Sequence, residues 1–320
     1  MPAIETTALT KRYGNDLLAV DDLDLTVEDG EIFGFLGPNG AGKSTTINML
    51  LDFVRPSTGT ATVLGLDAQN EADEIRERIG VLPEGASLYE RLTGREHLEW
   101  VIDTKGADED PDALLERVGL NPEDGARSAG GYSKGMAQRL GFAMALVGDP
   151  DLLLLDEPSS GLDPTGMQEM RDIIAAEADR GTTVFFSSHI LGEVEAVCDR
   201  VGIMNEGQLV ATGTLDALRA DLDLDASISL EVETVPDALV TDLEHHEGVH
   251  SVTVDGSTIT ASCAATPVKY DVVAQVGATT TVRDIVSEDT SLEQLFNTYT
   301  NDGDDVDGTP EAEREPEVSA

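Results

Sequence analysis

The chain has 320 residues, enough for one domain of about 200 residues and a smaller one. Its 63 acidic residues outnumber its 20 basic ones, and the resulting net charge of −43 disfavours direct binding to nucleic acid. No apolar run approaches the roughly 18 residues of a membrane-spanning helix, and no secretory signal is visible, so we expect a soluble chain.

The first 30 residues predict antiparallel strands, because apolar and polar side chains alternate over residues 3–30. Tyr13 lies there on a predicted turn, directly after Lys11 and Arg12. Its ring could stack on an adenine face or be a partly buried turn tyrosine. The motifs further along the chain favour stacking.

A phosphate-binding loop is predicted between an apolar strand, Ile32 to Leu36, and a helix that begins near Thr45. Its residues fit G-x-x-x-x-G-K-[ST] and are Gly37, Pro38, Asn39, Gly40, Ala41, Gly42, Lys43, Ser44 and Thr45. Glycines let successive N–H groups face phosphate oxygens, and the helix N-terminus adds its dipole. We expect Lys43 to reach the β- and γ-phosphates and Ser44 to bind Mg²⁺. A chance match in a glycine-rich turn is the weaker interpretation.

The middle of the chain alternates predicted strands and helices, as in an α/β domain. Strands are expected over Thr60–Leu64 and Ile79–Leu82, with a charged helix over Glu71–Arg78 between them. Residues from about 88 to 148 have helical periodicity interrupted by glycine and proline, which predicts a helical insert. We expect Trp100 to pack inside this insert.

Two further predicted strands end in side chains suited to phosphate chemistry. The leucines 152–155 are followed by Asp156 and Glu157, at the strand end where ligand crevices of parallel sheets lie. Asp156 is placed to hold Mg²⁺, and Glu157 could orient and deprotonate an attacking water. His189 follows a buried strand over Thr183–Ser188 and falls on the same sheet edge, where it could sense the γ-phosphate. A surface turn and a structural histidine are the alternatives.

Together these motifs resemble the nucleotide-binding domain of ABC ATPases over residues 3–218. The resemblance implies a P-loop NTPase fold with ATP and Mg²⁺ as ligands. It assigns Tyr13 to adenine stacking, residues 37–45 to the Walker A loop, Asp156 and Glu157 to the Walker B aspartate and catalytic glutamate, and His189 to the switch histidine, with Lys43 as a further catalytic group.

The sequence departs from the family pattern in two segments. Glu84 takes the position of the Q-loop glutamine and remains an oxygen ligand for Mg²⁺ or water, with an added negative charge. Residues 132–136 read Tyr-Ser-Lys-Gly-Met where the family has Leu-Ser-Gly-Gly-Gln. The resemblance implies that Ser133 and Gly135 touch the ATP of an opposite subunit, and it assigns Asp163 to the D-loop, residues 160–163. The signature resembles that of drug- and polysaccharide-exporter ATPases.

The resemblance implies an ATPase subunit that powers an exporter from the cytoplasmic face of the cell membrane. Its expected partners are separate membrane permease subunits and a second copy or a homologous ATPase, since the chain has one Walker A loop. A soluble ABC ATPase of translation or DNA repair, and a regulatory module of low turnover, are the alternatives.

The remaining residues predict an accessory part. After the ABC domain, 1–218, a linker over 219–225 leads to a βαββαβ pattern within residues 226–300, which suggests a small ferredoxin-like α+β domain. Residues 291–296 resemble the terminal helix of exporter ATPases. We expect the acidic tail, 301–320, to be disordered.

The charge pattern as a whole suggests adaptation to high salt. The chain has only five lysines and its acids are spread along its whole length, as on the surfaces of proteins from halophiles. At molar salt the screening length falls to about 3 Å, which removes most of the self-repulsion. An acidic surface that recognises a basic partner is the alternative.

Overall fold

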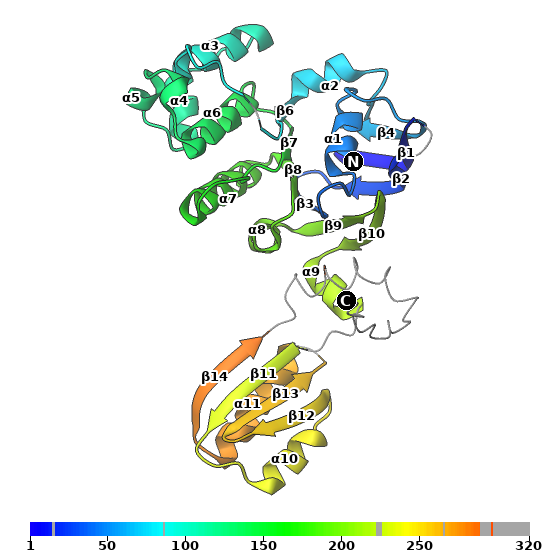
Figure 1. Ribbon diagram of the computed structural model, residues 1–320, viewed down its shortest axis with the longest axis vertical. Helices are drawn as coiled ribbons and strands as arrows, with labels where there is room; N and C mark the ends of the chain where they lie inside the picture. Colours follow the sequence, from blue (N-terminus) through cyan, green and yellow to red (C-terminus); the bar gives the residue numbers. More distant parts are fainter. Residues whose placement is uncertain (15–16, 86, 222–225, 265, 289–295, 297–320) are drawn as a thin grey trace, which may run out of the picture.

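The computed structural model describes residues 1–14, 17–85, 87–221, 226–264, 266–288 and 296 (Figure 1). In this part of the chain, no helix combines the length and the apolar character needed to cross a membrane. Two sheets form within the first 221 residues and a third within residues 226–288.

The first sheet is antiparallel, as the alternation over residues 3–30 predicts. Its strand order is β2-β1-β4-β5. The strands are β1 (Ile4–Tyr13), β2 (Leu17–Val27), β4 (Thr58–Val63) and β5 (Leu66–Asp67). Alternate side chains of β1 and β2 are buried, so that this sheet has a core face and a solvent face.

The second sheet positions the predicted site. Its order is β10-β9-β3-β8-β7-β6; β10 is antiparallel to β9, and the other neighbours are parallel. The strands are β3 (Ile32–Leu36), β6 (Ile79–Leu82), β7 (Leu152–Asp156), β8 (Thr183–Ser188), β9 (Arg200–Asn205) and β10 (Gln208–Gly213). Because β3, β6, β7 and β8 are parallel, the loops that follow them meet at one sheet edge.

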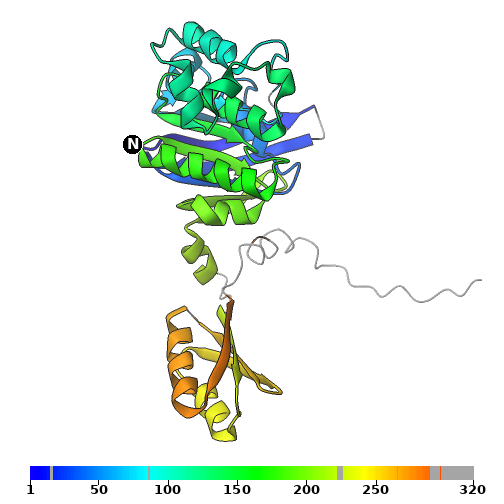
Figure 2. The ribbon, with the colours of Figure 1, turned by 90° about the vertical axis from the view of Figure 1, so that its left-hand side faces the viewer.

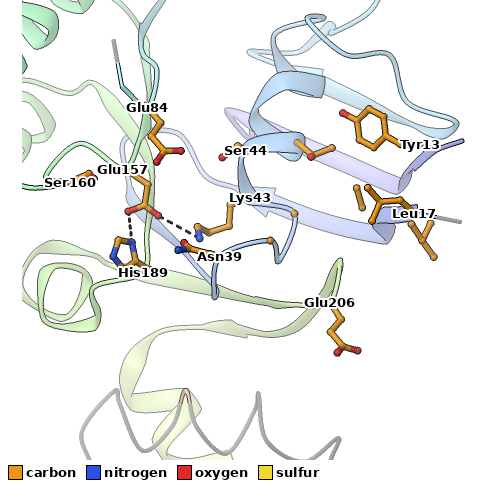
Figure 3. Close-up of a pocket in the computed structure, with 15 residues that line it drawn as sticks. Tyr13, Leu17, Asn39, Lys43, Ser44, Glu84, Glu157, Ser160, His189 and Glu206 are labelled. Atoms are coloured by element: carbon orange, nitrogen blue, oxygen red, sulfur yellow. Dashed lines mark hydrogen bonds and ion pairs between the residues drawn. The ribbon is translucent and has the colours of Figure 1, made fainter. Parts of the chain in front are cut away.

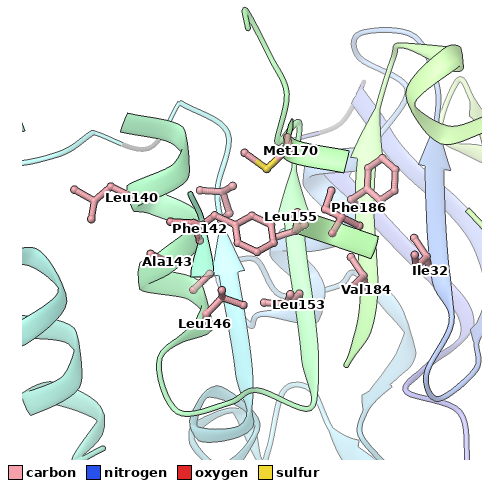
Figure 4. Packing of buried hydrophobic residues seen from close by; sticks show 14 of the residues in the cluster. Ile32, Leu140, Phe142, Ala143, Leu146, Leu153, Leu155, Met170, Val184 and Phe186 are labelled. Carbon is pink, nitrogen blue, oxygen red and sulfur yellow. The ribbon is translucent and has the colours of Figure 1, made fainter. Parts of the chain in front are cut away.

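Helices cover both faces of the parallel sheet. On one face, Phe33, Phe35 and Phe185 form a ring cluster that packs with α1 (Lys43–Leu50) and the antiparallel sheet. On the other, Phe142 and Met170 bring α6 (Lys134–Leu146) and α7 (Pro164–Asp179) against β7 and β8 (Figure 4). Full burial of one such side chain contributes about 2 kcal/mol. Outside the predicted insert, the first 221 residues also form α2 (Ala72–Arg78), α8 (Leu191–Val197) and α9 (Leu215–Asp221).

Helices also occupy the region of the predicted insert. They are α3 (Gly94–Lys105), α4 (Pro111–Arg117), α5 (Pro122–Gly125), a 3₁₀ turn (Ala129–Gly131) and α6. A capping box between Thr93 and Glu96 begins α3, and Gly106, with a φ of 65°, ends it.

The expected burial of Trp100 within this region is wrong. The Trp100 side chain is 54 % exposed, and its ring meets that of Tyr89 edge-on at 6.3 Å. Leu98 and Ile102 are the buried positions of α3. Trp100 lies midway between them in sequence and therefore on the opposite side of the helix, because adjacent residues turn by about 100°.

The third sheet has the order β12-β13-β11-β14. In chain order the elements are β11 (Ala226–Val232), α10 (Asp237–Glu244), β12 (Val249–Asp255), β13 (Thr258–Cys263), α11 (Thr266–Thr279) and β14 (Val282–Glu288). Both helices cover one face of this sheet, around Leu230 and Ile259 (Figure 2).

The predictions for the two ends of the accessory part concern residues that the structure describes only in part. Helix α9 reaches Asp221, inside the segment predicted as a linker, 219–225. Of the predicted terminal helix, 291–296, the structure describes residue 296 alone, and the predicted tail lies outside the described residues.

Candidate nucleotide-binding site

A cavity of about 750 Å³ opens at the carboxyl edge of the parallel sheet (Figure 3). It is formed by the phosphate-binding loop, by the ends of β1 and β2, and by the segments that follow β6, β7, β8 and β9. Its lining residues are Tyr13, Leu17, Leu18, Ala19, Asn39, Gly40, Gly42, Lys43, Ser44, Thr45, Glu84, Glu157, Ser160, His189 and Glu206.

The loop before α1 has the backbone shape that its glycines predict. Gly42 caps α1 with a φ of 109°, which L side chains rarely adopt, and a Cβ there would lie 2.4 Å from the carbonyl oxygen of Ala19. Lys43, Ser44 and Thr45, the first residues of α1, line the cavity. The first N–H groups of a helix have no partner within the helix, so this arrangement suits an anion.

Lys43 is buried and connects this loop to the strand ends. Its Nζ donates to the carbonyl oxygen of Gly37 at 2.8 Å and lies 3.5 Å from Oε1 of Glu157. The ammonium group therefore lies where it can contact both a bound phosphate and Glu157.

Glu157 makes a second contact across the sheet edge. Its Oε2 lies 2.7 Å from Nδ1 of His189 (Figure 3), and its φ of 51° is unusual for a residue other than glycine. Ser187 supports the same strand end, because its hydroxyl donates to Asp156 Oδ1 at 2.6 Å and accepts from the N–H of Glu157 at 3.0 Å. Glu157 is thus held by its backbone as well as by its side chain.

Tyr13 lies at the opposite end of the cavity from His189 (Figure 3). Its ring is 40 % exposed, and Lys11 Nζ lies 4.9 Å from the ring centroid. The exposed part of the ring is available for stacking on a planar base.

The structure brings most of the predicted ligands together and places the others elsewhere. Of the predicted site residues, Tyr13, Asn39, Gly40, Gly42, Lys43, Ser44, Thr45, Glu84, Glu157 and His189 line the cavity. Gly37, Pro38, Ala41 and Asp156 belong to the same loop and strand end but do not line it.

Three predicted nucleotide ligands line a second pocket of about 420 Å³ instead. Ser133 and Gly135 lie there at the start of α6, and Asp163 lies there at the start of α7. Both helix starts are capped, because Ser133 Oγ accepts from the N–H of Met136 and Asp163 Oδ1 accepts from that of Gly166. The segment 160–163 joins the two pockets: Ser160 lines the first, and Asp163 the second.

Sequence reasoning missed five residues of the cavity. Leu17, Leu18 and Ala19 of β2 line its wall near Tyr13, together with Glu206 of the turn after β9, and Ser160 lines it near Glu157. The alternation in β2 and the Asn-Glu-Gly turn indicate packing and chain reversal, and neither pattern signals a ligand.

The proposed Mg²⁺ ligands fit a hard cation. Ser44, Glu84 and Asp156 all present oxygen atoms, which Mg²⁺ prefers. Ser44 and Glu84 line the cavity, and Asp156 ends β7 directly before Glu157. One Asp156 oxygen is already occupied by Ser187, so this carboxylate suits contact through a single oxygen or through water.

The fold and the cavity define a P-loop nucleoside triphosphatase. The sequence model of the family described as ABC transporter matches residues 20–160. The bacitracin transport ATP-binding protein BcrA of Bacillus licheniformis is 46 % identical over 221 residues, which cover 68 % of this chain and 71 % of the relative. The daunorubicin/doxorubicin resistance ATP-binding protein DrrA of Streptomyces peucetius is 44 % identical over 69 % of this chain and 68 % of the relative.

The chain therefore belongs to the ABC transporter ATP-binding proteins, and the predicted family and ATPase class are confirmed. An ABC transporter ATP-binding protein of Nostoc is 46 % identical over 63 % of this chain, and the match spans 62 % of that relative's length.

Solved structures agree with this family. The ATP-binding subunit of an ABC transporter, 30 % identical, has a TM-score of 0.62 and covers 69 % of this chain and 93 % of its own. A dimeric ATP-binding cassette bound to ADP and Pi, 23 % identical, shares the fold with a TM-score of 0.61 over 66 % of this chain and 98 % of its own.

Proposed function

We propose that this chain is the ATP-hydrolysing subunit of an ABC exporter, bound at the cytoplasmic face of the membrane to separate permease subunits. The main support for the proposal is the position of Glu157, whose carboxylate contacts both Lys43 and His189 beside the phosphate-binding loop. The exporter class is supported by the relatives, whose names refer to bacitracin transport and to daunorubicin/doxorubicin resistance.

The roles of the side chains follow from their positions. The N–H groups of residues 37–45 and the Lys43 ammonium would bind the β- and γ-phosphates, while Tyr13 stacks on the base. Glu157 would accept a proton from the attacking water, and His189 would orient Glu157 and contact the γ-phosphate. Ser44, Asp156 and Glu84 would hold Mg²⁺, which neutralises phosphate charge when bound.

We propose that two ATPase subunits cooperate. Ser133, Gly135 and Asp163 line a pocket separate from the one that holds Lys43, so within one chain they do not reach the same ligand cavity. A second copy or a homologous subunit that presents its own Ser133 pocket to this cavity would complete both sites. ATP would then bridge the subunits, and hydrolysis would release them.

We propose the exposed aromatic rings of Phe53, Tyr89 and Trp100 as the contact surface for a permease subunit. Phe53 lines an apolar groove of about 370 Å³ together with Leu88 and Val101. Tyr89 and Trp100, the chain neighbours of Leu88 and Val101, line a separate pocket of about 430 Å³. The Tyr89 and Trp100 rings are in edge-on contact, and exposed apolar side chains that gather on one surface mark interaction sites, whereas single ones do not. Trp100→Ala should weaken permease binding, whereas Tyr270→Ala, which removes an exposed ring of α11, should not.

The rest of the chain is assigned by the same proposal. Residues 1–218 form the ABC domain, with its helical subdomain over about 88–148, and residues 226–300 form an accessory domain that follows the linker. The ferredoxin-like assignment is supported by the βαββαβ order and by the strand order β12-β13-β11-β14. We propose a halophilic source on composition alone.

The test is purification of tagged Glu157→Gln protein with ATP from detergent-solubilised membranes in multi-molar salt. The variant should remain ATP-bound and dimeric and should bring down a membrane protein with several spans, while purified wild type hydrolyses ATP. Wild-type turnover by Glu157→Gln would contradict the assigned base. Recovery with ribosomes or repair factors, without a membrane protein, would instead support a soluble ABC ATPase.

A further inference from the structure

Glu193 of α8 is a buried carboxylate that the proposed hydrolysis does not use. Its side chain is 2 % exposed and does not line the nucleotide cavity. Its Oε1 has no hydrogen-bond partner within the described part of the chain. Burial of a carboxylate oxygen without a partner is destabilising, so fold stability does not explain a glutamate at this position.

One set of contacts joins Glu193 to the segment that carries His189. Its Oε2 accepts a hydrogen bond from the hydroxyl of Ser188 at 3.1 Å. The same hydroxyl accepts from the N–H of Ile190 at 2.9 Å. Ser188 and Ile190 flank His189 in the chain, so the Glu193 carboxylate fixes the backbone on both sides of the histidine.

The segment that carries Glu157 lies close to Glu193. Burial raises the pKa of Glu193, and the hydroxyls of Ser159 and Ser188 oppose this rise. Ser159 is buried and lies two residues beyond Glu157. The negative charge of Glu157 also raises the pKa of Glu193, which places the two carboxylates within electrostatic reach of each other.

We propose that Glu193 is a positioning residue that fixes the segment after β8 through Ser188 and so holds His189 against Glu157 in the segment after β7. This arrangement maintains the 2.7 Å contact between Glu157 and His189. This inference rests on the proposed function, because the two segments carry the groups assigned to hydrolysis. Small displacements of such groups slow a reaction strongly even where substrate binding is unchanged.

Two substitutions separate positioning from packing. Glu193→Met removes the carboxylate and keeps a side chain of similar length, so the fold should be at least as stable as wild type. Its kcat should fall about tenfold, with the KM for MgATP within about twofold of wild type. Glu193→Gln keeps an oxygen that accepts from Ser188, and it should retain most of the wild-type kcat.

The matched control is Glu195→Met, which changes an exposed glutamate of the same helix and should leave kcat unchanged. The double variant Glu193→Met with Ser188→Ala should be no slower than Glu193→Met alone, because both changes remove the same contact. Losses that multiply in the double variant would show that Ser188 and Glu193 act independently.

A Glu193→Met protein with wild-type kcat would overturn the inference, and so would a loss that Glu193→Gln shares in full or that follows the melting temperature. Wild type and Glu157→Gln belong in the same assay. A wild type without turnover, or turnover that survives Glu157→Gln, would overturn the proposed function and this inference together. Turnover that depends on Glu157 but not on Glu193 would overturn the inference alone.

Discussion

Arg117 of α4 forms a bidentate ion pair with Glu177 of α7. Its Nε lies 2.7 Å from Glu177 Oε1, its Nη2 lies 2.5 Å from Oε2, and the Glu177 side chain is 2 % exposed. Hydrogen bonding by Glu177 raises the pKa of Arg117 above its ordinary value, so the guanidinium stays charged. The pair joins the helical insert to a helix of the parallel-sheet domain, and its geometry is specific because two parallel bonds form.

Removal of Arg117 should destabilise the domain. Among the described residues, Arg117→Ala leaves the buried Glu177 with the more distant Arg180, 3.8 Å away, and should cost about 3 kcal/mol in free energy of unfolding. Denaturant unfolding at constant high salt measures the difference. Arg78→Ala is the control, since it removes a half-exposed pair with Asp151 and should cost less than about 1 kcal/mol. Equal losses in the two variants would contradict the prediction.

The free energy of unfolding of the domain should fall with rising pH because of Glu193. Burial raises the pKa of Glu193 above 4.5, its usual value, so between 4.5 and the raised pKa the folded state binds more protons than the unfolded state. The contribution of this group to stability is therefore lost as pH rises through that window. Glu193→Gln does not titrate, and its stability relative to wild type should improve as pH rises from 4.5 toward neutrality.

The measurement is the free energy of unfolding of both proteins at several pH values, at one salt concentration. The difference between the two proteins isolates Glu193, because their other titratable groups are the same. A difference between wild type and Glu193→Gln that is constant with pH would show that Glu193 has the same pKa in both states.

The parts of the site that the sequence could predict are those set by strand ends. Glu157 and His189 each follow a fully buried parallel strand, and the carboxyl ends of such strands share one edge, so their proximity follows from two local patterns. The loop at Gly42 is likewise local, since its φ of 109° requires glycine.

The parts that the sequence could not predict depend on packing between distant segments. Leu17 and Glu206 enter the cavity wall because β2 and the turn after β9 dock beside the phosphate-binding loop, where Gly207 N–H donates to the Ala41 carbonyl oxygen. Trp100 is exposed because of its position around α3. Glu193 is buried beside Ser188 at the end of β8, which no periodicity in α8 reveals.

Low salt should unfold this protein. The net charge of −43 means that acidic side chains repel one another. The range of this repulsion is about 10 Å at 0.1 M salt and about 3 Å at 1 M, so screening at high salt stabilises the folded state. The melting temperature should rise steadily with KCl concentration up to the multi-molar range. A melting temperature that is the same at low and at multi-molar KCl would contradict halophilic adaptation. Sucrose at matched water activity is a useful control, because it lacks ions.

Two glycines of the phosphate-binding loop should respond differently to alanine. Gly42→Ala places a Cβ 2.4 Å from the Ala19 carbonyl oxygen at a φ of 109°, so the loop must move. Gly40→Ala meets no atom within 4 Å, although its φ of 87° still disfavours alanine. We expect Gly42→Ala to lose ATP binding and at least about 2 kcal/mol of stability, and Gly40→Ala to lose about 1 kcal/mol.

Fluorescent ATP-analogue titration and denaturant unfolding measure the two effects separately. If the clash with Ala19 governs the difference, ATP binding by Gly40→Ala should stay within about tenfold of wild type, which corresponds to about 1.4 kcal/mol. Equal loss of binding in both variants would mean that backbone strain alone decides the shape of the loop. Unaltered binding by Gly42→Ala would show that the loop tolerates a Cβ against β2, which would contradict the close approach seen here.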